Sequence, residues 1–164
     1  SFFHWQLERR GLRLRGGRIE QLLKANHVRD IMTSEYACVG EDMAIADIRD
    51  LLQNSAFGDL FVTGKSGELL GSITFADLKG VAFESGLDSL IIARDIMRPR
   101  PPVLMPAADL EDAIGLMGKS GQDCLPVVEI DGSMQVIGIV HHKAAMVAYN
   151  RALLQARAEE HDGR

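Results

Sequence analysis

Asp30-Ile31-Met32 recurs as Asp95-Ile96-Met97, 65 residues further along the chain. The offset persists, since Leu60-Phe61-Val62-Thr63 corresponds to Leu125-Pro126-Val127-Val128. Two extra residues then enter the second copy, so the later matches fall 67 residues apart. Similarity at a fixed offset indicates a repeated structural unit. Two copies are too few for a solenoid, so the sequence predicts a pseudo-twofold pair of small modules.

Each copy is expected to form a helical turn, a short strand, a helix, two strands joined by a turn, and a last helix. In the first copy these are 28–33, 37–39, a helix opening at Met43 and capped by Asp42, 60–63, 69–73, and 74 to about 85. In the second copy the strands are 103–105, 125–130 and 136–140, with helices from near Ala108 and from Lys143. The fold class is therefore α/β (α+β), as two βαββα-type modules.

We expect five segments along the chain. They are a linker with a short helix (1–27), the first module (28–85), a connector (86–92), the second module with a long final helix (93–158), and a polar tail (159–164). A half of roughly 60 residues is marginal alone, so the two modules are expected to fold as one unit.

Composition and charge exclude several classes of protein. With 46% hydrophobic residues the chain can form a core, yet it has no apolar run of the roughly 18 residues that cross a bilayer, and its start does not resemble a signal peptide. Residues 1–29 carry a net charge of +5 and the remainder −10, so nucleic acid is a poor partner. Cys38 and Cys124 lie in strand-like apolar runs and are expected to be buried, reduced thiols.

The repeated elements resemble the cystathionine-β-synthase (CBS) domain pair. The matching pieces are Val28–Met32, Ala93–Met97, and Gly71-Ser72-Ile73-Thr74-Phe75-Ala76-Asp77-Leu78, and the resemblance covers about residues 28–147. It implies an adenine nucleotide (AMP, ADP or ATP) as ligand in the cleft between the repeats, and no required cofactor. It also implies a homodimer.

In such pairs the Thr and Asp of a Gly-h-h-Thr-x-x-Asp segment (h apolar) hold ribose and phosphates, and Thr74 and Asp77 match this segment. The resemblance implies that the opposite repeat contributes Pro102, Val103, Gln122 and Asp123. Asp123 would face phosphate as a like charge, which favours few phosphates or none. A helix cap with a solvated acid is the alternative interpretation of Thr74 and Asp77.

The second cleft is weaker, because His141 stands where the Thr would be and Ala144 where the Asp would be. The residues that the resemblance assigns to this cleft are Thr33, Tyr36, Ala37, Phe57 and His141. Phe57 could still stack on a base. His141 and His142 do not suggest a metal site, because adjacent residues at a strand end point to opposite faces. We found no catalytic set, so an enzyme is not expected.

Residues 1–29 show a second resemblance. Leu7-Glu8-Arg9-Arg10-Gly11-Leu12, followed by Gly16-Gly17-Arg18, looks like the linker between the last transmembrane helix and the cytoplasmic CBS pair of prokaryotic CLC-type chloride channels and transporters. Aromatic residues before a basic cluster are typical of a cytoplasmic membrane exit. The sequence thus predicts a cytoplasmic regulatory domain at the inner membrane, attached to a transmembrane part of the same polypeptide. A solvated basic linker is the alternative, and a CBS-pair sensor of a soluble enzyme or of another transporter is the rival function.

Overall fold

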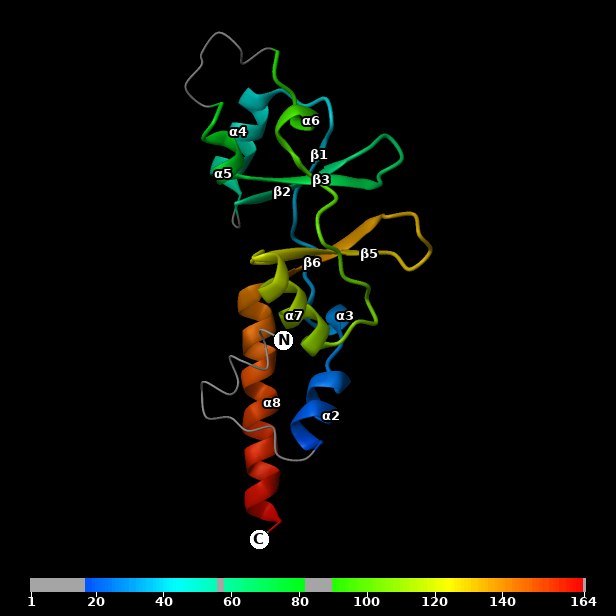
Figure 1. Cartoon of the computed structure of the whole chain (residues 1–164), viewed down its shortest axis with the longest axis vertical. Coiled ribbons are helices and arrows are strands. Elements are labelled where there is room, and N and C mark those ends of the chain that lie inside the picture. The colour runs from blue at the N-terminus through cyan, green and yellow to red at the C-terminus, as the bar shows by residue number, and fades with distance from the viewer. Residues whose placement is uncertain (1–16, 56–57, 82–89, 164) are drawn as a thin grey trace. The chain divides into compact units, whose positions relative to one another are not determined.

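The structure is a computed structural model that describes residues 17–55, 58–81 and 90–163 (Figure 1). The helices are α2 (Arg18–Ala25), α3 (Val28–Ile31), α4 (Ile45–Asn54), α5 (Phe75–Leu78), α6 (Ala93–Ile96), α7 (Leu110–Ser120) and α8 (His142–Asp162). The strands are β1 (Cys38–Gly40), β2 (Asp59–Thr63), β3 (Leu69–Thr74), β4 (Arg98–Pro99), β5 (Cys124–Val128) and β6 (Val136–His141). The predicted α/β (α+β) class is confirmed.

The strands form two sheets. One has four strands in the order β1-β2-β3-β4, in which β1 runs parallel to β2 and the other neighbours are antiparallel. The other sheet pairs β5 with β6. Each hairpin, β2–β3 and β5–β6, occupies the same place in its repeat, as the sequence offset predicts.

The chain divides into two compact units that cut across the repeats. One unit draws its residues from 1–34, 102–128 and 138–164, and the other from 35–101 and 129–137. The opening turn of the first repeat, α3, therefore belongs with α7 and α8 of the second. The opening turn of the second repeat, α6, belongs with β1, β2 and β3 of the first. The repeats exchange their first turns.

Backbone hydrogen bonds hold the second repeat's turn in the unit of 35–101 and 129–137. Arg98 of β4 pairs with Ser72 of β3 in an antiparallel register. The Ala93 amide, at the start of α6, donates to the carbonyl of Met43 at 2.9 Å. The turn thus adds a fourth strand to the sheet and closes the loop that precedes α4.

The other unit contains the equivalent bonds. Thr33 and Ile139 exchange two backbone hydrogen bonds, of 2.9 and 3.0 Å. The Val28 amide donates to the carbonyl of Ala108 at 2.8 Å. These four residues lie 65 or 67 positions from their counterparts in the unit of 35–101 and 129–137, so the backbone contacts recur at the same offset as the sequence.

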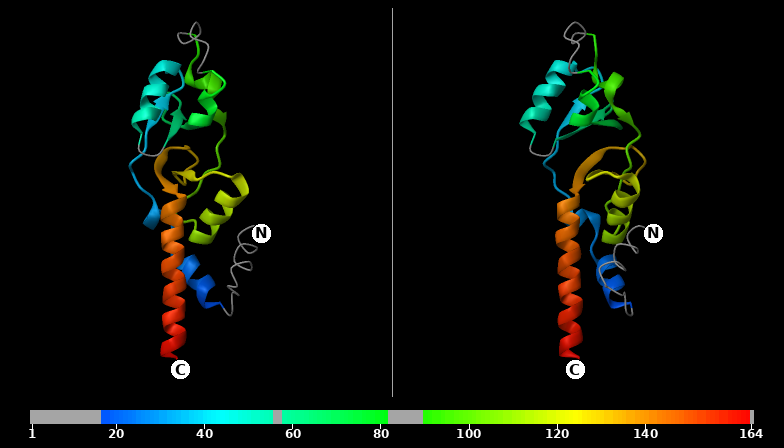
Figure 2. Two further views of the ribbon diagram at one scale, coloured as in Figure 1. Left: turned by 90° about the vertical axis from the view of Figure 1, so that its left-hand side faces the viewer. Right: turned by 60° about the vertical axis from the view of Figure 1, so that its left-hand side comes forward.

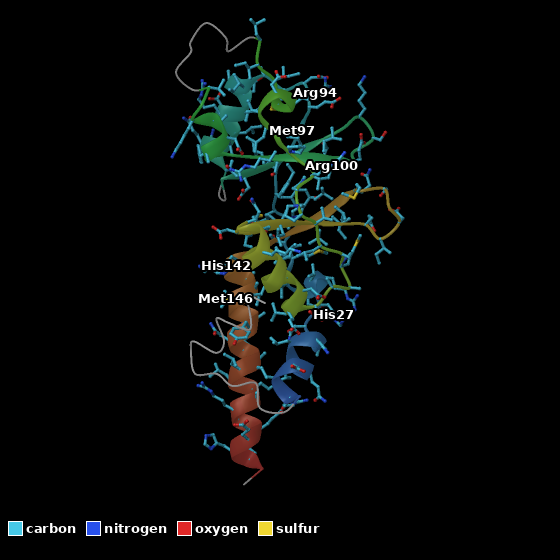
Figure 3. All side chains as sticks on the ribbon, in the orientation of Figure 1. His27, Arg94, Met97, Arg100, His142 and Met146 are labelled. Carbon is cyan, nitrogen blue, oxygen red and sulfur yellow. The ribbon has the colours of Figure 1, made fainter. Side chains whose placement is uncertain are left out.

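A glycine in each unit admits the methionine of the exchanged turn. A Cβ at Gly71 would lie 2.7 Å from Met97 Sδ and 2.8 Å from the carbonyl oxygen of Arg98. A Cβ at Gly138 would lie 2.8 Å from Met32 Sδ and 3.2 Å from the next carbonyl oxygen. Figure 3 shows Met97 beside β3. Neither glycine has a positive φ, so backbone conformation does not require glycine at these positions. The close approach of the methionine and of the backbone oxygen does.

The helical stripes predicted from spacing face the cores. The α4 residues Ile45, Ile48 and Leu52 are buried with apolar residues of the four-stranded sheet. In α7 all four predicted positions are buried, namely Leu110, Ala113, Ile114 and Met117.

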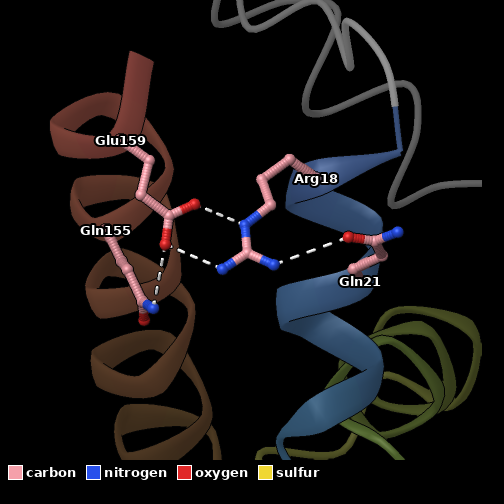
Figure 4. Close-up of polar contacts among 4 residues, drawn as sticks. All are labelled: Arg18, Gln21, Gln155 and Glu159. Atoms are coloured by element: carbon pink, nitrogen blue, oxygen red, sulfur yellow. Dashed lines mark hydrogen bonds and ion pairs between the residues drawn. The ribbon is translucent and has the colours of Figure 1, made fainter. Parts of the chain in front are cut away.

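Helix α2, the end of the predicted linker, is docked on the body of its unit. Ile19, Leu22 and Leu23 are buried, and α2 lies alongside α8 in each view (Figures 1 and 2). Arg18 spans the two helices: its Nη2 donates to Glu159 Oε1 at 2.7 Å and its Nε pairs with Glu159 Oε2 (Figure 4). The Gln155 side chain donates to the same carboxylate at 3.3 Å. The short helix predicted within residues 1–27 is confirmed as α2.

Two predictions about helix limits in the second half of each repeat are wrong. The helix after Thr74 was expected to reach about Ser85, whereas α5 ends at Leu78, two residues before Gly80, a residue that disfavours helix. Residues 82–89 lie outside the described part of the chain. The polar tail from Glu159 is helical as far as Asp162, because α8 continues past the ion pair with Arg18.

Three smaller predictions also fail. Asp42 does not cap α4, whose N-cap is Ala44, because Asp42 and Glu41 instead face the guanidinium of Arg94. Cys124 is buried but Cys38 is exposed, since Val39 is the residue of β1 that faces inward. The strand expected at 103–105 is not formed; in its place Leu104 makes a single isolated parallel bridge with Val127.

Candidate functional site

At the end of β3, in the described part of the chain, two polar side chains singled out by the sequence hydrogen-bond to each other. Thr74 leaves the strand as the N-cap of α5, and Asp77 lies three residues further, so the two side chains meet. Asp77 Oδ2 accepts the Thr74 amide at 2.8 Å and the Thr74 Oγ1 hydroxyl at 3.2 Å. The structure therefore brings together the two residues that the sequence singled out.

Arg98 completes this constellation. Its Nε donates to Asp77 Oδ1 at 2.9 Å, and the Asp77 side chain is only 11% exposed. Thr74 and Asp77 thus form the helix cap of the alternative interpretation, but the acid is paired with Arg98 rather than solvated. β-pairing positions the arginine, because Arg98 faces Ser72, two residues before Thr74.

Sequence reasoning missed Arg98, although a signal was present. Arg98 follows Asp95-Ile96-Met97 directly and corresponds to Thr33 in the first repeat, which was named for the second cleft. Applying the same offset to both clefts would have identified it. Its proximity to Asp77 depends on the exchanged turn, which the repeat pattern does not reveal.

The other residues predicted for this cleft belong to the unit that contains 102–128, not to the unit of Thr74 and Asp77. Pro102 and Val103 are half-buried and precede the bridge at Leu104. The Gln122 amide donates to Ser120 Oγ at 3.3 Å, and the exposed Asp123 accepts the His142 amide on its carbonyl at 2.8 Å. Their roles toward a ligand stay predictions.

The residues of the weaker cleft are also divided. Thr33 and His141 lie in the unit of α8, where His141 is the N-cap of that helix and burial lowers the pKa of its imidazole. Tyr36 and Ala37 lie in the other unit, where the Tyr36 hydroxyl donates to the carbonyl of Val136 at 3.0 Å and burial raises its pKa. Phe57 lies outside the described residues.

His141 and Ala144 repeat the positions of Thr74 and Asp77 but not their chemistry. Ala144 supplies no carboxylate, and His141 makes no side-chain cap bond to α8. The first-repeat pair therefore provides the better polar site of the two.

An open hollow of about 570 Å³ lies elsewhere in the same unit as Thr74. Its lining includes Glu41, Asp42, Asp47 and Lys65, and none of the predicted site residues. Carboxylates on its wall disfavour an anion. No three His, Cys, Asp or Glu residues of the described part of the chain are grouped so as to hold a metal ion. Within the same ranges, we found no helix with the length and hydrophobicity of a membrane span.

Comparison with known proteins places these observations in a family. The family model of the CBS domain matches residues 28–84 and 93–150, which together are more than half of the chain. No curated protein matches. Among solved structures, CBSX2 in complex with AMP is 27% identical, with a TM-score of 0.66, over 80% of this chain and 98% of that one.

Two further structures share the fold. The cytosolic domain of the Mg²⁺ channel MgtE in complex with ATP is 24% identical, with a TM-score of 0.64, over 79% of this chain and 52% of that one. The CBS domain of a bacterial CNNM/CorC family Mg²⁺ transporter in complex with ATP is 18% identical, with a TM-score of 0.68, over 80% and 94%. With the family model matching twice, at the offset seen in the sequence, this chain belongs to the CBS domain family as a tandem pair.

Proposed function

We propose that this CBS pair is a regulatory domain that binds an adenine nucleotide, with Thr74 and Asp77 as ligands of the ribose. The observation that carries the proposal is the Asp77 carboxylate, held by Thr74 in a nearly buried position at a strand end. A carboxylate is acceptor-only and suits the two hydroxyl donors of a ribose. The AMP complex of CBSX2, at 27% identity, supports the choice of ligand.

The proposed role is binding rather than catalysis. A ligand regulates only if it binds one state of the whole protein better than another. A nucleotide bound between chain segments that are far apart in sequence meets this requirement, because its affinity depends on how those segments are arranged. Pro102, Val103 and Gln122 remain proposed contacts of the ligand, and Asp123 remains the residue expected to face its phosphate as a like charge.

The experiment is a thermal-shift titration with AMP, ADP and ATP. Ligand at about 100 times Kd should stabilise the chain by about 2.7 kcal/mol. For a chain of this size that is a rise in Tm of roughly 5–10 °C. Asp77→Ala and the milder Asp77→Asn should abolish the rise, whereas Asp50→Ala, which removes an exposed carboxylate from α4, should leave it unchanged.

Two results would contradict this proposal. A rise that survives both Asp77 substitutions would move the nucleotide to the cleft of His141 and Tyr36. No rise with any of the three nucleotides at millimolar concentration would show that the pair does not bind them. Calorimetric titration at low temperature replaces the melting assay if an Asp77 variant is too unstable to melt cooperatively.

We further propose that the pair is the cytoplasmic regulatory domain of a CLC-type chloride channel or transporter at the inner membrane, and acts as a homodimer. The basic head from Leu7 to Arg18 supports this attachment, although Leu7–Gly16 lie outside the described residues. The reading frame upstream of Ser1 should then encode several apolar segments of about 20 residues. An upstream soluble domain would favour the rival, a sensor attached to an enzyme.

A further inference from the structure

The inference rests on the proposed function and concerns the state of Asp77 before a ligand binds. An ionised carboxylate offers about four lone-pair sites for hydrogen bonds. Three are occupied: Oδ2 accepts the amide and the hydroxyl of Thr74, and Oδ1 accepts Arg98 Nε. Among the contacts that the described residues make, one site on Oδ1 has no donor.

A ribose diol needs more than one acceptor. Its two adjacent hydroxyls each donate a hydrogen bond, and Asp77 can accept both only if another donor leaves. The Thr74 bonds are local, three residues away in the chain, and they start α5. Arg98 is the donor that can move away from Asp77. Its side chain is long, flexible and half-exposed, so it can adopt another position without disturbing the backbone.

An arginine that leaves its carboxylate needs another anion. In the described part of the chain, Arg98 donates only through Nε, so Nη1 and Nη2 are available for a partner. This planar pair of donors fits the oxygens of a phosphate group bidentately. A phosphate on the ribose bound to Asp77 would be such a partner at short range.

We propose that Arg98 determines specificity by exchanging partners: when ribose hydroxyls bind Asp77, Arg98 moves to the phosphate of the same ligand. The site then selects phosphorylated ribosides over neutral nucleosides. When AMP binds, Arg98 loses its ion pair with Asp77 but gains one with the phosphate. Adenosine breaks the same ion pair and has no phosphate to replace it.

The test compares AMP with adenosine by calorimetric titration of the intact chain and of Arg98→Gln. The unmodified chain should bind AMP about 10- to 100-fold more tightly, the value of one charge-assisted hydrogen-bonded contact. In Arg98→Gln the preference should fall to within about threefold, because AMP binds more weakly while adenosine binds equally well or better. Arg98→Lys keeps the positive charge but lacks the planar pair of N–H donors, so its preference for AMP over adenosine should be intermediate.

Arg94→Gln is the matched control, since Arg94 is half-exposed and paired with a carboxylate in the same unit. It should leave both affinities unchanged. Equal weakening of AMP and adenosine by Arg98→Gln would show a purely structural role and overturn the inference, as would an unchanged preference. If the unmodified chain bound neither compound, the proposed function itself would be wrong. If it bound both tightly with no preference, the proposed function would stand and only the role of Arg98 in specificity would be wrong.

Discussion

At the residue scale, close packing constrains Gly71 and Gly138, one in the last hairpin strand of each repeat. Each lies against the methionine of the other repeat's opening turn, at distances that leave no room for a Cβ. The contact at Gly71 includes a backbone oxygen at 2.8 Å, which cannot rotate away, while the equivalent oxygen at Gly138 is 3.2 Å away. The first repeat should therefore tolerate a side chain less well.

We expect Gly71→Ala to lower the free energy of unfolding by about 1–3 kcal/mol, the usual cost of overpacking, and Gly138→Ala to lower it less. Gly115→Ala is the control: it is within α7 and its Cβ would meet nothing within 4 Å, so it should raise stability by about 0.5–1 kcal/mol. Urea denaturation measures all three. A Gly71→Ala variant as stable as the parent would disprove the close approach.

At the element scale, α2 illustrates how an amphipathic segment becomes part of a core. Its three buried residues follow helical spacing, and the helix lies alongside α8 in every view (Figure 2). The ion pair between Arg18 and Glu159 adds geometric specificity at the exposed edge of this contact (Figure 4). Burial of apolar area is the larger contribution, because exposed ion pairs contribute little to stability.

Leu23→Ala in α2 should therefore cost about 2–5 kcal/mol of stability, as for other fully buried leucines. Leu23 is 1% exposed. The adjacent Lys24→Ala, at an exposed position, should change stability by less than about 0.5 kcal/mol. Thermal and urea denaturation of the two variants make the comparison. Equal, small effects would mean that α2 is an undocked linker, as the solvated-linker alternative supposes.

At the scale of the whole molecule, the exchange of opening turns decides what can fold alone. A fragment of residues 28–91 is one complete sequence repeat, yet it lacks α6 and β4, so Ser72 and the edge of β3 lose their partner strand. A fragment of residues 35–101 breaks the repeat boundary but keeps every strand of the four-stranded sheet.

We therefore expect the 35–101 fragment to keep more cooperative structure in urea than the 28–91 fragment, with both less stable than the whole chain. The two are similar in length, so chain length does not explain a difference. Far-UV circular dichroism across a urea series distinguishes them. The opposite ranking would show that each repeat keeps its own opening turn.

Local signals in the sequence determined a large part of this description. The helical stripes of α4 and α7, the two hairpins and the meeting of Thr74 with Asp77 all follow from residues that are close in the chain, and the repeat offset is visible in the sequence itself. Periodicity and short-range spacing encode such features directly, because the backbone geometry of a helix or strand fixes which neighbours share a face.

The tertiary structure alone decided which distant segments meet. Spacing does not reveal that Arg98 contacts Asp77, that Cys38 faces outward on its strand, or that α2 docks on α8. The contact of Arg98 with Asp77 depends on the exchange of opening turns between repeats, and identical motifs in both copies are equally compatible with either pairing. In the structure the exchanged turns are packed closely, with Met97 against Gly71 and Met32 against Gly138, and close packing between segments far apart in the chain leaves no local pattern in the sequence.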